Sequence, residues 1–179
     1  MTEEQLIELA KEGDLDAYDD LMRTYYPIVE RFSFQLGNSM DTVDDITQEV
    51  FLRVYRNLHQ YSYGKFSTWL YKITLNVTKD AHRKRKSVRE KIKMLKRQPK
   101  SPELSTEASI LHNERDRELH RIIQQLDDKY KVPIVLFYFQ EKGQEEIAAI
   151  LKLPVNTVKT RISRGKSQLK SIWEGGDGK

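Results

Sequence analysis

Two stretches of the chain place cations, amides and hydroxyls at helical spacing, and proteins use these residue types to bind nucleic acid. The C-terminal stretch follows a tight turn and carries its polar side chains along one side of a helix. From a helix in the major groove, such side chains reach base edges and phosphates. We therefore predict that residues 144–172 form a helix-turn-helix that reads duplex DNA. The predicted DNA-facing side chains are Asn156, Lys159, Thr160, Ser163, Arg164 and Ser167.

Apolar spacing defines the two helices of this motif. The first helix covers residues 144–151 and packs through Ile147, Ala148, Ile150 and Leu151. After a turn, Pro154 suits the start of the second helix. The core-facing stripe of the second helix has steps of four and three, at Val158, Ile162, Gly165, Leu169 and Ile172. An ordinary solvated amphipathic helix is the alternative, but a short helix, a tight turn and a basic second helix together favour DNA binding.

The other stretch, residues 66–83, carries an aromatic side chain, an amide and cations on one helical face. This combination suits a nucleic-acid strand with unstacked bases. The face is formed by Trp69, Lys72, Asn76, Lys79 and Arg83, opposite a buried stripe at Leu70, Ile73, Val77 and Ala81. The alternative places Trp69 in the core and the cations in solvent. The preceding loop favours nucleic acid, because bases could stack on Tyr61 and Tyr63 beside Lys65.

The elements that position these stretches are all predicted to be helical, because glycine and proline are scarce and apolar residues recur at helical spacing. A first helix ends at Gly13, and Asp14 caps the next, in which Pro27 makes a kink or starts a new turn. Further helices are expected from about 41 to 58 and from about 67 to 85, and a second helical unit begins near Ser109. We predict an all-α protein with two small helical domains at residues 1–88 and 109–174, a linker at 89–108 and a tail at 175–179.

The predicted linker is basic. Between Lys79 and Lys100 the chain carries 11 lysines and arginines against Asp80 and Glu90, although the net charge of the whole chain is only +4. Pro99 and Pro102, with serines nearby, indicate a flexible connection. Neutralising Lys91, Lys93, Lys96 and Arg97 tests the hypothesis that the linker follows nucleic acid, since the salt dependence of the complex should then fall.

Several functional classes are disfavoured. The chain has no cysteine, and therefore no disulfide and no thiolate nucleophile or metal ligand. Its acidic N-terminus is unlike a signal peptide and no apolar run approaches about 20 residues, so we expect a soluble, cytoplasmic protein. An enzyme is the main alternative, with acids Asp41, Asp44, Asp45 and Glu49 and histidines His59, His82, His112 and His120 as candidate groups. These lack ligand spacing and a partner motif, so we expect no catalysis, cofactor, metal or small-molecule substrate.

Several segments resemble a known family, the bacterial sigma factors of RNA polymerase. Residues 44–55 and 66–73, Asn76 and the basic run from Arg83 resemble domain 2, and residues 126–130, 145–148 and 155–165 resemble domain 4. The closest group is the extracytoplasmic-function (ECF) class, which keeps only these two domains. The resemblance implies a transcription initiation factor that directs core RNA polymerase to promoters. A free-standing helix-turn-helix regulator is the alternative, but it leaves the Trp69–Arg83 face without a purpose.

The resemblance also implies roles for individual residues. The minus-thirty-five element would be read as duplex by Asn156, Lys159, Thr160, Ser163 and Arg164, with Arg161 and Lys166 on phosphates. The minus-ten element would be melted, with a flipped base held by Tyr61, Ser62, Tyr63, Gly64, Lys65, Trp69, Asn76, Lys79 and Arg83. The clamp helices of the polymerase would bind Asp44, Asp45, Gln48 and Glu49, although acids near a helix start are also explained by the helix dipole.

Further partners are implied in the same way. The polymerase flap would bind domain 4, and two weak modules on one polymerase would give usable affinity through effective concentration. An anti-sigma factor, often membrane-anchored, would hold the protein inactive. Two departures from the family pattern are expected to alter the backbone: Lys152 replaces the common turn glycine, and Pro133 lies within an expected helix, which we therefore expect to begin near it.

Overall fold

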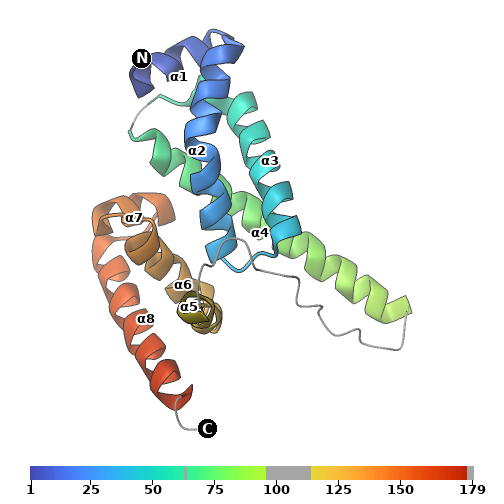
Figure 1. Cartoon of the computed structure of the whole chain (residues 1–179), viewed down its shortest axis with the longest axis vertical. Coiled ribbons are helices and arrows are strands. Elements are labelled where there is room, and N and C mark those ends of the chain that lie inside the picture. Colours follow the sequence, from blue (N-terminus) through green and yellow to red (C-terminus); the bar gives the residue numbers. More distant parts are fainter. Residues whose placement is uncertain (63, 96–113, 177–179) are drawn as a thin grey trace. The chain divides into compact units, whose positions relative to one another are not determined.

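The computed structural model describes residues 1–62, 64–95 and 114–176, and within these ranges every regular element is helical. The all-α prediction is therefore confirmed. The first elements are α1 (Glu3–Lys11), α2 (Leu15–Gln35), α3 (Met40–Asn57), the 3₁₀ turn η1 (Leu58–Gln60) and α4 (Phe66–Leu95) (Figure 1). The later elements are α5 (Glu114–Gln124), α6 (Asp128–Ile134), the π-helical turn η2 (Val135–Phe139), α7 (Gln144–Leu151) and α8 (Val155–Gly176).

The chain divides into two compact units, Met1–Ser33 with Ser39–Glu107 and Phe34–Asn38 with Ala108–Lys179. Tyr63 of the predicted minus-ten site lies outside the described residues. So do Lys96, Arg97 and the proline-containing part of the predicted linker, residues 109–113, and the end of the tail.

Helix boundaries in the N-terminal unit follow local side-chain chemistry. The backbone N–H of Ala17 donates to Asp14 Oδ1 at 3.0 Å, which confirms Asp14 as the cap of α2. Gly13 has a φ of +95°, a left-handed conformation that ends α1 cleanly. α2 continues through Pro27 as one helix.

The core of the N-terminal unit is formed where α2, α3 and α4 present their apolar stripes. The apolar stripe of α3 is buried, with Ile46, Val50 and Val54 each at most 2% exposed, and α3 packs mainly against α4. Burying one such side chain contributes about 1.5–3 kcal/mol. Between α2 and α3, the Tyr18 hydroxyl donates to the Phe51 carbonyl at 2.7 Å, and burial raises the pKa of Tyr18 to about 12.

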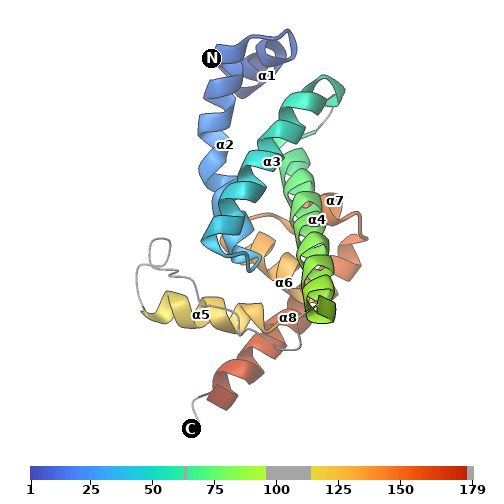
Figure 2. The same cartoon turned by 90° about the vertical axis from the view of Figure 1, so that its right-hand side faces the viewer.

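α4 is longer than its predicted end near Arg85. It runs to Leu95, because residues 85–95 contain no glycine or proline and are mostly good helix formers. The Arg85 guanidinium donates to Thr42 Oγ1 at 3.1 Å near the first turn of α3. Beyond this contact the last turns of α4 extend past α3 (Figures 1 and 2), and Val88 and Ile92 are exposed.

In the C-terminal unit, the prediction that a helix begins near Pro133 is wrong. α6 begins at Asp128, whose carboxylate suits a helix N-terminus, and Pro133 lies inside the helix. Proline has no N–H to donate, so the regular bonding pattern is interrupted there. The chain continues into the π-helical turn η2, where the Gln140 N–H donates to the Val135 carbonyl at 3.1 Å.

Two further features complete the fold. α6 and α8 approach closely at Gly165, where an added Cβ would lie 2.8 Å from Ile134 Cγ1, so a larger residue at this position would force the helices apart. None of the described helices is long and apolar enough to cross a membrane.

Candidate nucleic-acid interfaces

The helix-turn-helix prediction is confirmed in geometry. α7 and α8 are joined by the short turn at residues 152–154 (Figure 1). Lys152 has φ 54° and ψ 47°, the left-handed conformation that glycine adopts without strain. The next N–H, of Leu153, donates to the Ala148 carbonyl at 3.0 Å, which closes the helix end as in a Schellman motif. Lysine therefore forms the turn that glycine would form, contrary to the expected change of backbone, and its backbone carries the strain.

The two faces of α8 are as predicted at its N-terminal half. Val158, Ile162 and Gly165 are buried against the rest of the unit, and Leu169 and Ile172 are half-buried. Arg161 is half-buried and Lys166 is exposed. The predicted base-reading side chains are all exposed: Asn156, Lys159, Thr160, Ser163 and Arg164.

α6 adds two residues that the analysis of patterns did not assign to DNA. Lys129 and Tyr130 lie beside α8, with Lys129 Nζ 4.9 Å from the centre of the Tyr130 ring. Together with α8 they line a shallow hollow of about 390 Å³ formed by Lys129, Tyr130, Asn156, Thr157, Thr160, Arg161 and Arg164. Spacing along α8 carries no information about α6, so only the packing of the two helices brings these residues together.

A side chain of the loop before α4 forms a hydrogen bond with the loop's own backbone. The Tyr61 hydroxyl donates to the carbonyl of Gly64, which has a φ of +88°. Lys11 Nζ of α1 also lies over this tyrosine, 5.5 Å from the centre of the Tyr61 ring. Ser62, Gly64 and Lys65 are exposed around this fixed aromatic ring.

Trp69 is neither fully buried nor fully exposed. Its side chain is half-buried, and its ring centre lies 5.4 Å from that of Tyr61 and 5.7 Å from that of the buried Phe66. Aromatic pairs at these distances stabilise one another. Trp69 is therefore part of the core, and its exposed part lies next to the predicted minus-ten loop.

The polar face of α4 is exposed at Asn76, Lys79 and Arg83, and half-buried at Lys72. Trp69 and Arg83 are separated by 14 residues, which is about 21 Å along a helix that rises 1.5 Å per residue. The predicted site is therefore an elongated face that could contact several nucleotides, rather than a single pocket.

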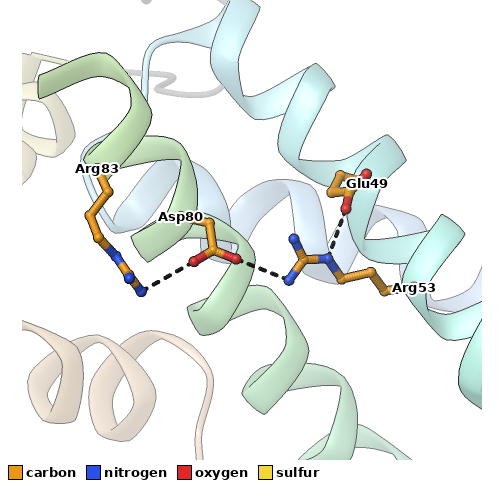
Figure 3. Close-up of polar contacts among 4 residues, drawn as sticks. All are labelled: Glu49, Arg53, Asp80 and Arg83. Atoms are coloured by element: carbon orange, nitrogen blue, oxygen red, sulfur yellow. Dashed lines mark hydrogen bonds and ion pairs between the residues drawn. The ribbon is translucent and has the colours of Figure 1, made fainter. Parts of the chain in front are cut away.

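Two residues that the sequence analysis did not single out connect this face to α3. Arg53 donates from Nε to Glu49 Oε1 at 2.8 Å and from Nη1 to Asp80 Oδ2 at 3.1 Å, and Arg83 Nη2 lies 3.2 Å from Asp80 Oδ1 (Figure 3). The hydrogen bond with Glu49 is the largest of the effects that raise the pKa of Arg53. A chain of four charged side chains thus runs from the predicted polymerase face to the predicted minus-ten face.

The predicted polymerase contacts lie along the solvent side of α3. Asp44, Asp45 and Gln48 are exposed, and Glu49 is half-buried. Gln48 also borders an apolar hollow of about 350 Å³ between α2 and α3, lined by Tyr18, Met22, Tyr26, Gln48, Phe51, Leu52 and Tyr55. Phe51 is buried, whereas Tyr55 on the same helix is 52% exposed.

The acids and histidines weighed as catalytic groups do not form a metal site in the part of the chain that is described, where no three of them are placed to hold one ion.

Comparison with known proteins identifies the family. Residues 21–88 match the model of sigma-70 region 2, and residues 116–169 match that of sigma-70 region 4. The chain is 34% identical over 174 residues to the ECF RNA polymerase sigma factor SigW of Bacillus subtilis, covering 92% of each protein. It belongs to the ECF sigma factors. The ECF sigma factor SigE of Mycolicibacterium smegmatis is 30% identical over 162 residues, covering 87% of this chain and 61% of that protein.

Solved structures support the fold. The complex of CnrH with the cytosolic domain of CnrY contains a chain that matches with a TM-score of 0.73 at 23% identity, covering 95% of this chain and 96% of that one. The sigma factor RpoE from Bartonella quintana, solved with the anti-sigma factor NepR, matches with a TM-score of 0.70 at 18% identity, covering 88% and 96%. As an ECF sigma factor, the protein is a transcription initiation factor that directs RNA polymerase to promoters, and it is not an enzyme.

Proposed function

We propose that this sigma factor reads its promoters at two places with two different surfaces. α8 reads the minus-thirty-five element as duplex, and α4 with its preceding loop holds the minus-ten element as a melted strand. The observation that carries the proposal is that α8 exposes a polar face while the apolar stripe on its opposite side is buried.

The chemistry of α8 supports duplex reading. An α-helix fits the major groove, where Asn156 can pair with an adenine edge and Lys159 or Arg164 with a guanine edge. From Val155 to Trp173 the helix contains no acid, so this part of it is compatible with a phosphate backbone. Arg161 and Lys166, joined by Lys129 of α6, would hold phosphates and fix the position of the helix on the DNA.

The loop and α4 support strand binding. A flipped base would lie against the exposed part of Trp69 and the loop residues Tyr61, Ser62, Gly64 and Lys65, and Tyr63 of the same loop is included by its position in the sequence. Further along the helix, Asn76 offers an amide to a base edge. Lys79 is placed to hold the backbone of the strand, and Arg83, which pairs with Asp80, lies one turn further along.

The α3 face would bind the clamp helices of core polymerase. Asp44, Asp45 and Glu49 supply negative charge, and Gln48 lies at the rim of the apolar hollow between α2 and α3. A hollow of this kind can receive apolar side chains while the acids fix the register. The C-terminal unit would bind the flap of the polymerase in turn.

An anti-sigma factor would regulate the protein. The Bartonella relative was solved with an anti-sigma factor, which supports the same class of partner for this chain. We place the protein in the cytoplasm, where an anti-sigma factor anchored in the membrane would hold it until an inducing signal arrives.

Reconstituted transcription tests the proposal. The full chain is mixed with bacterial core RNA polymerase and genomic DNA fragments, and start sites are mapped from the transcripts. We expect transcripts that begin downstream of shared minus-thirty-five and minus-ten sequences, and a footprint that needs the polymerase. Tight, sequence-specific binding to duplex DNA by the protein alone, without promoter-specific transcripts, would instead identify a free-standing helix-turn-helix regulator.

A further inference from the structure

The basic face of α4 contains a single acid in its first 24 residues. Between Phe66 and Arg89 that acid is Asp80, and it lies among Lys79, Arg83 and Lys84. A carboxylate at this place repels a nucleic-acid backbone, because phosphates carry the same sign of charge. Its presence in a face that would bind a strand therefore needs a reason.

The contacts of Asp80 suggest what it does. One carboxylate oxygen accepts from Arg53 at 3.1 Å and the other lies 3.2 Å from Arg83 Nη2, so both oxygens are engaged (Figure 3). The Arg53 and Asp80 side chains are 35% and 39% exposed, whereas that of Arg83 is 79% exposed. Arg53 is therefore held between two helices, whereas Arg83 is a surface cation with one end tied to Asp80.

Removing the charge of Asp80 would affect the two arginines differently. Arg53 would keep Glu49, to which its Nε donates at 2.8 Å, so its charge would not be left unpaired. Arg83 would lose its acidic neighbour and become free to approach phosphate. A contact with phosphate adds affinity for any strand, because phosphates are the same in every sequence.

We propose that Asp80 is a positioning residue that sets specificity at the minus-ten strand, by holding Arg83 back from sequence-independent phosphate binding. This rests on the proposed function of the α4 face. A strand with the matching sequence is fixed by base contacts and gains little when Arg83 is released. An unrelated strand has no such register, so it can shift until its phosphates meet Arg83.

The experiment uses the full chain bound to core RNA polymerase. Two fluorescent single strands are titrated at several salt concentrations: the non-template minus-ten strand of a promoter found by transcription mapping, and a scrambled strand of the same composition. For D80N we expect the scrambled strand to bind about fivefold more tightly and the matched strand about twofold. The plot of log affinity against log salt should steepen by about 0.7 for the scrambled strand, the value for one more phosphate neutralised on a single strand.

Matched variants separate positioning from stability. D80E keeps the charge and should behave like the wild type, whereas E90Q removes an exposed acid elsewhere on α4 and should change scrambled-strand binding by less than twofold. R53Q removes the ion pair between Arg53 and Asp80 and leaves Arg83 as the remaining partner of Asp80 among these residues, so it should weaken strand binding. If Asp80 only tied the helices together, D80N and R53Q would change binding in the same direction.

The double variant D80N/R83Q decides the mechanism. The proposal predicts that it binds both strands like R83Q alone, because Asp80 acts through Arg83. A gain from D80N that persists without Arg83, or a D80N protein that folds and binds like the wild type, overturns the proposal. If the wild type shows no preference for the matched strand, the proposed function of the α4 face fails, and the scrambled strand still decides whether Asp80 restrains Arg83.

Discussion

The two candidate DNA surfaces are built in different ways. The reading face of α8 belongs mostly to one helix: its polar side chains are exposed, and the hydroxyls of Thr160 and Ser167 donate to carbonyls of their own helix. The face of α4 is assembled from three regions. Lys11 of α1 lies over Tyr61, Trp69 packs on Tyr61, and Asp80 ties Arg83 to Arg53 of α3.

The difference reflects the shape of the two ligands. Duplex DNA has a regular groove that one straight helix fits. A helix with suitable side chains therefore needs only to be packed against the protein on its opposite face. A melted strand has no fixed shape, and the protein must supply the aromatic surface and the charges that hold it. We therefore expect the α8 surface to depend on the buried residues that pack beneath it, and the α4 surface to depend on its contacts with neighbouring side chains.

The largest expected effect comes from removing the support of α8. Ile162→Ala leaves a cavity beneath the reading face, because Ile162 is 6% exposed. We expect the free energy of unfolding to fall by about 2–4 kcal/mol. Chemical denaturation of the full chain, followed by Trp173 fluorescence in a W69F background, measures it. An exposed control on the same helix, Ser163→Ala, should change stability by under about 0.5 kcal/mol.

Next in size is the loss of the aromatic surface at α4. Trp69→Ala should weaken binding of the minus-ten strand to the holoenzyme by about 1–3 kcal/mol, because the stacking surface is lost. Trp69→Phe keeps an aromatic ring and should recover much of the affinity. Titration of the labelled strand gives both values, and equal binding by the alanine variant would mean that Trp69 serves only the core.

Substitutions of two cations of α8, Arg164 and Lys166, should change DNA binding in different ways. Arg164→Ala should cost about 1–3 kcal/mol on the promoter duplex and relax preference at one base pair, since Arg164 is assigned to a base edge. Lys166→Ala should weaken all duplexes alike and reduce the salt slope by about 0.9, since Lys166 is assigned to phosphate. Competition with single-base variants of the minus-thirty-five duplex separates the two, and the same profile for both would contradict the assignment.

The smallest effect is expected at the turn. Lys152→Gly should raise the free energy of unfolding by about 1 kcal/mol, because lysine occupies a left-handed conformation at φ 54° that glycine adopts freely. Lys152→Ala removes the same side chain but keeps the Cβ, and it should give no such gain. Thermal unfolding of both variants shows whether the strain lies in the backbone.

The α8 and α4 surfaces also differ in how much of each could be predicted from the sequence. The α8 face was predictable, because apolar stripe, turn and polar side chains all lie in one continuous segment. The residues that complete it from α6, Lys129 and Tyr130, were not, since their place depends on how two helices pack. On α4, spacing identified Asn76, Lys79 and Arg83, but the contact of Asp80 with Arg53 joins residues 27 positions apart.

The errors in helix limits also have physical causes. Pro133 was expected to start a helix, as proline often does, but Asp128 starts it earlier and a π-helical turn accommodates the interruption. α4 was expected to end near Arg85, where the basic run becomes dense. Charge alone does not stop a helix that lacks glycine and proline.

The central claim is that α8 and α4 read different forms of promoter DNA independently. The most direct test measures, for one holoenzyme preparation, the affinity for a minus-thirty-five duplex and for a minus-ten single strand, in the wild type, Arg164→Ala and Trp69→Ala. We predict that Arg164→Ala weakens only the duplex and Trp69→Ala only the single strand, each by at least about fivefold. If either substitution weakened both probes equally, the two surfaces would not be separate readers.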